Sequence, residues 1–143
     1  MTLEQLEMIK YLNQAFYLDK RVNALIAEKE ENISLATRCT ANYGDNNSNP
    51  SKHNGTEKIL IRIAEQEEEI NTRIDKLVEV RSQIAEIINS VEDMDEQTIL
   101  SYRYLSYKNM SEIAELMHYH RNTIQNKHNS AIKNIVLKCA VKL

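Results

Sequence analysis

The side chains that could do chemistry gather near the C-terminal end of this chain. Arg, Asn, Gln and His recur there within a few residues of one another: His120, Arg121, Asn122, Gln125, Asn126 and Asn129. In the major groove of DNA, Arg can make a bidentate pair of hydrogen bonds with guanine, and Asn or Gln can do the same with adenine. If these residues share the outward face of one helix, that face has the chemistry to read bases. A solvated polar face is the alternative.

Basic residues near this set are candidates for phosphate contacts, which fix the register on DNA without reading its sequence. The candidates are Lys127, Lys133 and Arg103. Residues 101–143 contain seven Lys or Arg and two Asp or Glu, whereas residues 1–100 contain 11 and 19. An acidic front and a basic tail are expected of a protein whose tail alone meets phosphate, although a chance drift in composition is the alternative.

The stretch SEIAELMHYHRNTIQ, residues 111–125, has the spacing of a helix-turn-helix. In that motif a small residue lies where the helices meet, a tight turn follows four residues later, and a branched apolar residue lies ten residues after the small one. Ala114, His118 and Ile124 occupy those positions. His118 is therefore expected to adopt a positive backbone angle, which His tolerates better than most residues. Apolar contacts around the turn are expected from Ile113, Met117 and Tyr119.

Capping residues predict where the C-terminal helices begin. Asp93 with Glu96, and Asn109 with Glu112, have the spacing of reciprocal N-terminal caps. The last helix is expected to begin at residues 120–121. A small core beside these helices is expected from Tyr102, Tyr104, Tyr107 and Tyr119, with stacking on single-stranded bases as the alternative.

Residues 94–133 resemble region four of bacterial sigma factors, the helix-turn-helix that binds promoter DNA. The matching residues are Ile99, Leu100, Arg103, Tyr104, Glu112, Ile113, Ala114, Glu115, Thr123, Ile124, Ala131 and Ile132. The whole chain is similar to a family of small prophage proteins of Gram-positive bacteria that are often labelled sigma-like transcriptional regulators. The resemblance implies a DNA-binding regulator that also contacts RNA polymerase through the same module. Two positions depart from the pattern, since His118 replaces a glycine and His120 replaces a capping Ser or Thr.

The first hundred residues predict a long antiparallel helical hairpin. The two Gly and the one Pro of the chain all fall in GDNNSNPSKHNG, so one exposed and mobile polar loop is expected over residues 41–56. The helix after it, expected over Glu57–Asp93, has a heptad pattern at Ile63, Ile70, Leu77, Ile84 and Val91, with a companion line at Leu60, Ile74 and Ile88 that Glu67 and Arg81 interrupt. The helix before the loop has matching lines at Tyr11, Leu18 and Leu25 and at Ala15, Val22 and Ala36, interrupted by Lys29 and Asn32.

The predicted fold is therefore all-α, with a helical hairpin over residues 1–92 and a C-terminal helix-turn-helix domain over residues 93–143. Few Gly and Pro and no Trp fit that class. Each hairpin helix has more than one apolar line and only one partner, so the hairpin is expected to form a homo-oligomer or to pack on the C-terminal domain.

Other chemistry has little support. His118, His120, His128 and Cys139 lack the spacing of metal ligands, and Cys39 and Cys139 form no CxxC pair. The chain has no Gly-rich phosphate loop and no nucleophile with an oriented base, so neither an enzyme nor a cofactor is expected. Without a long apolar run or a signal peptide pattern, the chain is expected in the cytoplasm and away from membranes.

Three functions remain open. The first is a sequence-specific phage or prophage transcription regulator that binds double-stranded DNA. The second is a DNA-packaging recognition subunit, since small terminase subunits also combine a helix-turn-helix with a helical oligomerisation hairpin. The third is a protein-interaction module without DNA binding.

Overall fold

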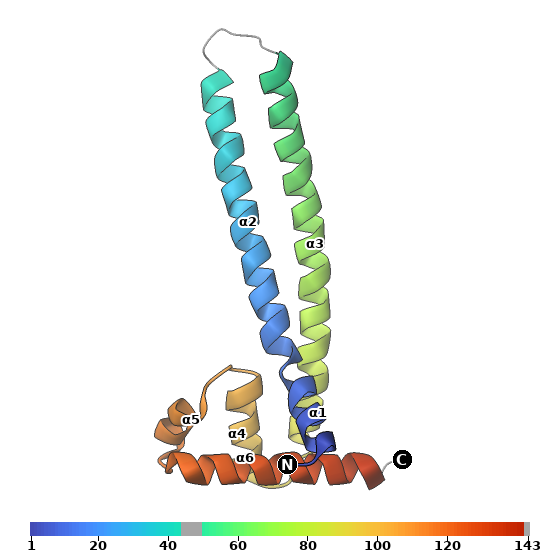
Figure 1. Ribbon diagram of the computed structural model, residues 1–143, viewed down its shortest axis with the longest axis vertical. Helices are drawn as coiled ribbons and strands as arrows, with labels where there is room; N and C mark the ends of the chain where they lie inside the picture. The colour runs from blue at the N-terminus through green and yellow to red at the C-terminus, as the bar shows by residue number, and fades with distance from the viewer. Residues whose placement is uncertain (44–49, 142–143) are drawn as a thin grey trace. The chain divides into compact units, whose positions relative to one another are not determined.

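A computed structural model of the chain describes the backbone of residues 1–43 and 50–141 and the side chains of residues 1–39 and 55–139. These residues form six α-helices and no β-strand, so the prediction of an all-helical chain is confirmed. The helices, drawn in Figure 1, are α1 (Leu3–Leu12), α2 (Gln14–Tyr43), α3 (Pro50–Asn89), α4 (Met94–Tyr104), α5 (Met110–Met117) and α6 (Arg121–Val141). None of the helices, as far as they are described, is long and apolar enough to cross a membrane.

The chain forms two compact units. Unit 1 comprises Met1–Tyr17 and Leu77–Leu143, and unit 2 comprises Leu18–Lys76. The division falls within α2 and α3, because each of these long helices contributes residues to both units. The predicted division into a helical hairpin over residues 1–92 and a helix-turn-helix domain over residues 93–143 stays a prediction.

In unit 2, α2 and α3 run antiparallel and are joined by polar as well as apolar contacts. Asn32 Nδ2 donates to Gln66 Oε1 over 2.9 Å, and Lys29 Nζ lies 3.9 Å from Glu67 Oε1. Gln66 is only 1% exposed. A buried amide needs a hydrogen-bond partner, and Asn32 supplies it.

The heptad pattern of α3 is confirmed in one line and wrong in part of the other. In the main line Ile63 is half-buried, whereas Ile70, Leu77 and Ile84 are buried. Val91, which follows the end of α3, is buried as well. In the companion line Ile88 is buried and Ile74 is half-buried, but Leu60 is 54% exposed. Gln66, one position before Glu67 of that line, is buried instead. Apolar periodicity cannot predict the burial of Gln66, because that burial depends on the hydrogen bond from Asn32.

Three predicted boundaries are wrong. The loop expected over residues 41–56 is shorter at both ends, because α2 continues to Tyr43 and α3 begins at Pro50. The mobility expected of residues 44–49 lies outside the described residues. Proline suits the first turn of a helix, where an N–H group would have no partner. The helix expected to reach Asp93 ends at Asn89, and the helix before the loop is divided at Asn13 into α1 and α2.

In unit 1, α6 packs against α1, α4 and α5. Its buried residues follow one face of the helix: Ile124, His128, Ala131, Ile132 and Ile135. Near the start of α6, Ile124 shares a small core with Ile99 of α4 and Ile113 of α5, all of them fully buried. One face of α6 is therefore committed to the core, and the other is left accessible.

The connection between α4 and α5 is tied to α3 through Arg81. Its Nη1 donates to the carbonyl of Leu105 and to the hydroxyl of Tyr107, each over 2.9 Å. Tyr107 has a φ of 60°, and its ring lies edge-on to that of Phe16 at 5.5 Å. Arg81 thus interrupts the apolar line of α3 because it anchors this connection.

The Asn32–Gln66 pair can be tested by a double-mutant cycle. Asn32→Leu is expected to lower the free energy of unfolding by about 1–3 kcal/mol, because the buried Gln66 amide loses its partner. Asn32→Leu with Gln66→Leu is expected to recover most of that loss, since two apolar side chains can pack together. Urea denaturation measures both values. If the double variant loses as much stability as Asn32→Leu and Gln66→Leu lose together when each is made alone, the pairing is contradicted.

Candidate nucleic-acid interface

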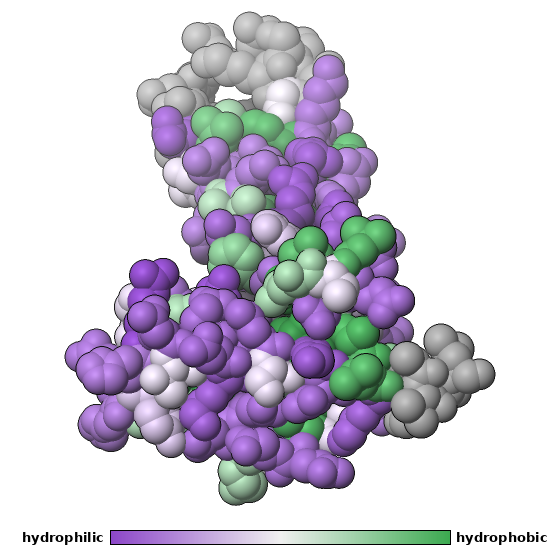
Figure 2. Space-filling model, turned by 60° about the horizontal axis from the view of Figure 1, so that its bottom comes forward, coloured by the Kyte–Doolittle hydropathy of each residue, from purple (hydrophilic) through white to green (hydrophobic). Residues whose placement is uncertain are grey.

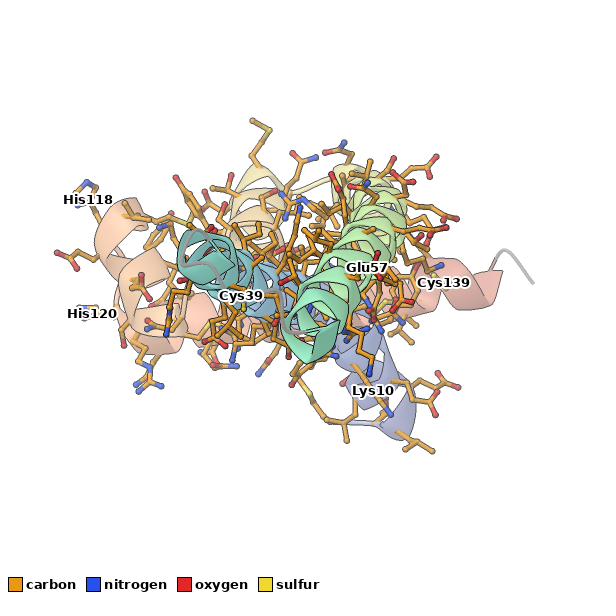
Figure 3. The ribbon with its side chains drawn as sticks, turned by 90° about the horizontal axis from the view of Figure 1, so that it is seen from above. Lys10, Cys39, Glu57, His118, His120 and Cys139 are labelled. Atoms are coloured by element: carbon orange, nitrogen blue, oxygen red, sulfur yellow. The ribbon has the colours of Figure 1, made fainter. Side chains whose placement is uncertain are left out.

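The six residues predicted to read bases all lie on the accessible side of α6 or just before it. His120, Arg121, Asn122 and Asn126 are exposed, and Gln125 and Asn129 are half-buried. Lys133, one turn beyond Asn129, is exposed as well. In Figure 2, hydrophilic residues predominate on the left of the lower part, where the N-terminal half of α6 lies, and hydrophobic residues gather toward its C-terminal end. Figure 3 shows His118 and His120 pointing outward, away from the other helices of unit 1.

The turn between α5 and α6 is closed at His118. This residue has φ 59° and ψ 39°, in the left-handed region, so the positive backbone angle predicted for it is confirmed. The N–H groups of His118 and Tyr119 both donate to the carbonyl of Ala114, a closure typical of helix C-termini. Ala114 and Ile124 belong to the same buried cluster, so the predicted small and branched positions meet where α5 and α6 contact each other.

The predicted caps form completely at α5 and by half at α4. Asn109 and Glu112 make the reciprocal pair of hydrogen bonds expected of them. Asp93 accepts from the N–H of Glu96 at 3.0 Å, but the carboxylate of Glu96 is buried and accepts from Asn134 of α6 at 3.4 Å. The reciprocal half of the α4 cap is therefore wrong, because Glu96 links α4 to α6 instead.

Asp95 joins α4, the turn and α6. Its Oδ2 accepts from the hydroxyl of Tyr119 at 2.8 Å and lies 3.6 Å from Nζ of Lys127. The ammonium of Lys127 also lies 5.5 Å from the centre of the Tyr119 ring. The hydrogen bond to Asp95 is the main cause of a raised Tyr119 pKa. Tyr119 is 39% exposed, so the apolar contact predicted for it is wrong: its ring serves this polar cluster.

Two of the predicted phosphate contacts already have partners within the chain. Arg103 Nη1 donates to the carbonyl of Lys108 over 3.1 Å, and Lys127 pairs with Asp95. Each is half-buried, whereas Lys133 is exposed. Arg103 thus stabilises the connection between α4 and α5, and Lys127 links α6 to α4. Lys133 is the most accessible of the three cations.

A pair that the sequence did not predict lies under α6. His128 is 3% exposed, and its Nε2 lies 2.6 Å from the hydroxyl of Tyr104. Burial lowers the pKa of His128 and raises the pKa of Tyr104 to about 12, so both are neutral at neutral pH. Nδ1 of His128 lies 3.2 Å from Oδ1 of Asn129, which also accepts from Nε2 of Gln125 at 3.2 Å. The position of His128 four residues after Ile124 was a signal of burial that sequence alone did not distinguish from a metal ligand.

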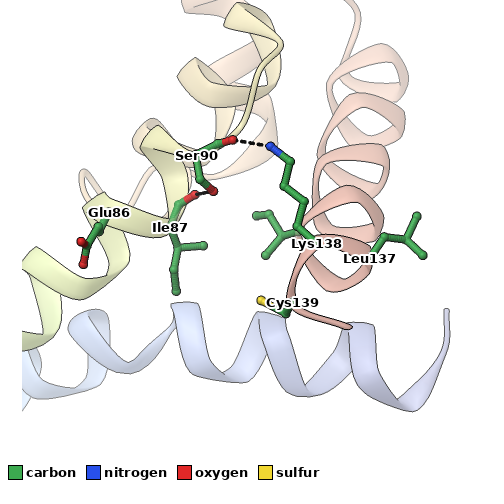
Figure 4. Close-up of a pocket in the computed structure, with 7 residues that line it drawn as sticks. Glu86, Ile87, Ser90, Leu137, Lys138 and Cys139 are labelled. Atoms are coloured by element: carbon green, nitrogen blue, oxygen red, sulfur yellow. Dashed lines mark hydrogen bonds between the residues drawn. The ribbon is translucent and has the colours of Figure 1, made fainter. Parts of the chain in front are cut away.

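The C-terminal end of α6 closes a hollow against the end of α3 (Figure 4). The hollow is lined mostly by apolar atoms, from residues that include Ile87, Ile135 and Leu137. Two of its polar side chains bond to backbone: Lys138 Nζ donates to the carbonyl of Ser90 over 2.6 Å, and the hydroxyl of Ser90 donates to the carbonyl of Ile87. These contacts fix the end of α6 on α3. Among the described residues, no three His, Cys, Asp or Glu side chains are grouped as metal ligands would be.

A family model described as a protein of unknown function, DUF1492, matches residues 39–136. The chain belongs to the DUF1492 family. The matched span of this DUF1492 protein includes all of α3, α4 and α5 and most of α6, and thus every residue of the accessible α6 face described above. No curated protein and no solved structure matches the chain.

The backbone strain at His118, inside the DUF1492 span, can be relieved. His118→Gly is expected to raise the free energy of unfolding by about 1 kcal/mol, because glycine has no Cβ to oppose the left-handed conformation. His118→Val is expected to lower it, since a β-branched residue is strained there. Thermal unfolding of wild type, His118→Gly and His118→Val measures the order of their stabilities. A glycine variant less stable than wild type would contradict the account of the turn.

The buried His128 predicts how the stability of this DUF1492 protein changes with pH. Its pKa is lowered in the folded state, so as pH falls below the ordinary value of 6.5 the unfolded chain binds a proton first. The contribution of neutral His128 to the free energy of unfolding is therefore fully present above pH 6.5. It decreases as pH falls from 6.5 toward the pKa of His128 in the folded state. Urea denaturation of wild type and His128→Gln across this range isolates the effect. A constant difference between the two proteins would contradict it.

Proposed function

We propose that this chain is a sequence-specific DNA-binding protein of a phage or prophage, with α5 and α6 acting as a helix-turn-helix. The observation that carries the proposal is the accessible polar side of α6 on a helix whose other side is buried. A helix held in this way, with one side exposed along its first turns, has the form that enters a major groove. In this proposal the chain is an antiparallel hairpin followed by a C-terminal helix-turn-helix domain.

The accessible residues of α6 divide between bases and phosphates by their chemistry. Arg121, exposed in the first turn, reads guanine, and the amides of Asn122, Gln125, Asn126 and Asn129 read adenine or neighbouring acceptors. His120, exposed just before the helix, meets the bases together with the first turn of α6. Lys133 contacts the backbone, while Lys127 and Arg103 contribute positive charge near it.

The proposed role is transcription regulation in the cytoplasm, with RNA polymerase as a second partner of the same module. The charge distribution supports a nucleic-acid partner for the C-terminal part, since residues 101–143 carry an excess of five basic residues in an acidic chain. The likeness of residues 94–133 to sigma region four supports promoter DNA as the target.

Exposed apolar side chains in unit 2 favour an oligomer. Because an oligomer suits a DNA-packaging subunit, that alternative stays open. Unit 2 exposes large apolar side chains at Ile33, Leu35, Leu60 and Ile61, each at least 43% exposed. Exposed apolar surface of this kind is typical of contacts with another protein. Light scattering separates the alternatives, since a ring of many copies would favour packaging and a monomer or dimer would favour regulation.

Two substitutions separate base reading from phosphate contact. Arg121→Ala is expected to weaken binding to the preferred duplex by about 1–3 kcal/mol and to relax the preference at one position. Lys133→Ala is expected to weaken all duplexes alike and to flatten the salt dependence by about one counterion, because a phosphate contact does not depend on sequence.

Fluorescence anisotropy with preferred and scrambled duplexes across a salt series measures both effects, after circular dichroism has shown that each variant is folded. If wild type binds no duplex at low salt, DNA binding is excluded and the protein-interaction alternative takes its place.

A further inference from the structure

The accessible side of α6 is connected to the core by a row of four hydrogen-bonded side chains, here named the amide row: Tyr104, His128, Asn129 and Gln125. The distances along it are 2.6 Å from Tyr104 Oη to His128 Nε2, 3.2 Å from His128 Nδ1 to Asn129 Oδ1, and 3.2 Å from Asn129 Oδ1 to Gln125 Nε2. The row begins at two buried residues and ends at two half-buried ones on the predicted reading side. It therefore links a fixed group in the core to groups that DNA can reach.

The direction of each hydrogen bond follows from the buried end. The hydroxyl of Tyr104 is buried and keeps its proton, and His128 Nε2 is the acceptor that the structure places beside it. If Nε2 accepts, a neutral imidazole must carry its proton on Nδ1. That proton needs an acceptor, so the oxygen of Asn129 faces His128. The neighbouring group of Gln125 must then be its NH₂, because an oxygen there would repel the oxygen of Asn129.

We propose that the amide row fixes the side-chain amide of Gln125 in the orientation that reads adenine, with Tyr104, His128 and Asn129 as positioning residues. The inference rests on the proposed DNA-binding function. One hydrogen of the Gln125 NH₂ is used by Asn129, which leaves the second hydrogen and Oε1 for a base. That donor and acceptor match N7 and the N6 amino group of adenine.

Fixing the amide matters because a glutamine amide that is free to turn reads two bases. With oxygen and nitrogen exchanged, the NH₂ group can donate to the N7 and O6 acceptors of guanine. The amide row disfavours this exchange, since it would bring Oε1 of Gln125 against Oδ1 of Asn129. Asn129 itself has committed its oxygen within the row, so it presents only N–H donors to DNA.

The test is a selection from randomised duplexes that compares the adenine-to-guanine ratio at each position of the site. Gln125→Ala identifies the position that Gln125 reads. Asn129→Ala is expected to reduce the ratio at that same position by about tenfold although Gln125 is retained, because the amide becomes free to turn. Tyr104→Phe removes the buried hydroxyl that lies beside His128 Nε2 and is expected to reduce the ratio at that position as well, although Tyr104 is buried away from DNA; it also serves if the Ala variant does not fold. Ser130→Ala, at an exposed position of α6 outside the predicted base-reading and phosphate-contact residues, is the matched control and should leave the ratio unchanged.

An Asn129→Ala protein that is folded and keeps the wild-type ratio at the Gln125 position overturns the inference while leaving DNA binding intact. A ratio kept in a folded Tyr104→Phe protein overturns it too, since the buried end of the amide row is then missing.

A second measurement does not need DNA. The ¹⁵N chemical shifts of the His128 ring in the free protein are expected to show a protonated Nδ1 and a bare Nε2. The opposite tautomer overturns the inference whether or not DNA binds. If the expected tautomer is found but no duplex binds, the proposed function has failed, and the adenine assignment fails with it.

Discussion

The burial of one side of α6 is the constraint on which the rest of unit 1 depends. Ile124, Ile132 and Ile135 can leave water only if α1, α4 and α5 cover them, and that covering fixes which residues stay outside. Since side chains on a helix repeat about every 3.6 residues, burying this line turns Asn122, Asn126 and Lys133 toward solvent. The accessible polar side is thus a consequence of core packing and needs no separate arrangement.

Polar side chains fix how the elements of unit 1 are placed against each other, which apolar packing alone does not determine. Apolar side chains bury area without direction, whereas a buried hydrogen bond requires one partner in one place. Arg81 ties the connection after α4 to α3, Asp95 ties the turn to α6, and His128 joins the core to Asn129. Each lies where two elements of unit 1 meet. In unit 1, these three polar side chains therefore fix how neighbouring elements pack against each other.

Local patterns predicted local structure well and paired structure poorly. The Asn109–Glu112 cap and the left-handed turn at His118 depend on residues close in sequence, and both are confirmed. The six candidate base-reading residues were correctly expected outside the core, because Ile124 and its periodic partners could be recognised as apolar. By contrast, the burial of Gln66 and of His128 depends on Asn32 and Tyr104, which are distant in sequence. The extent of the loop before α3 was overestimated because Pro50 also suits the first turn of a helix.

DNA is proposed to contact the accessible side of α6. A titration of ¹⁵N-labelled protein with a short duplex, followed by two-dimensional NMR at low and at raised salt, tests this contact directly. We expect amide and side-chain signals to shift mainly from Arg121 to Lys133, and added salt to reverse the shifts because phosphate contacts release counterions. Spectra that stay unchanged with DNA, or shifts confined to unit 2, would contradict it.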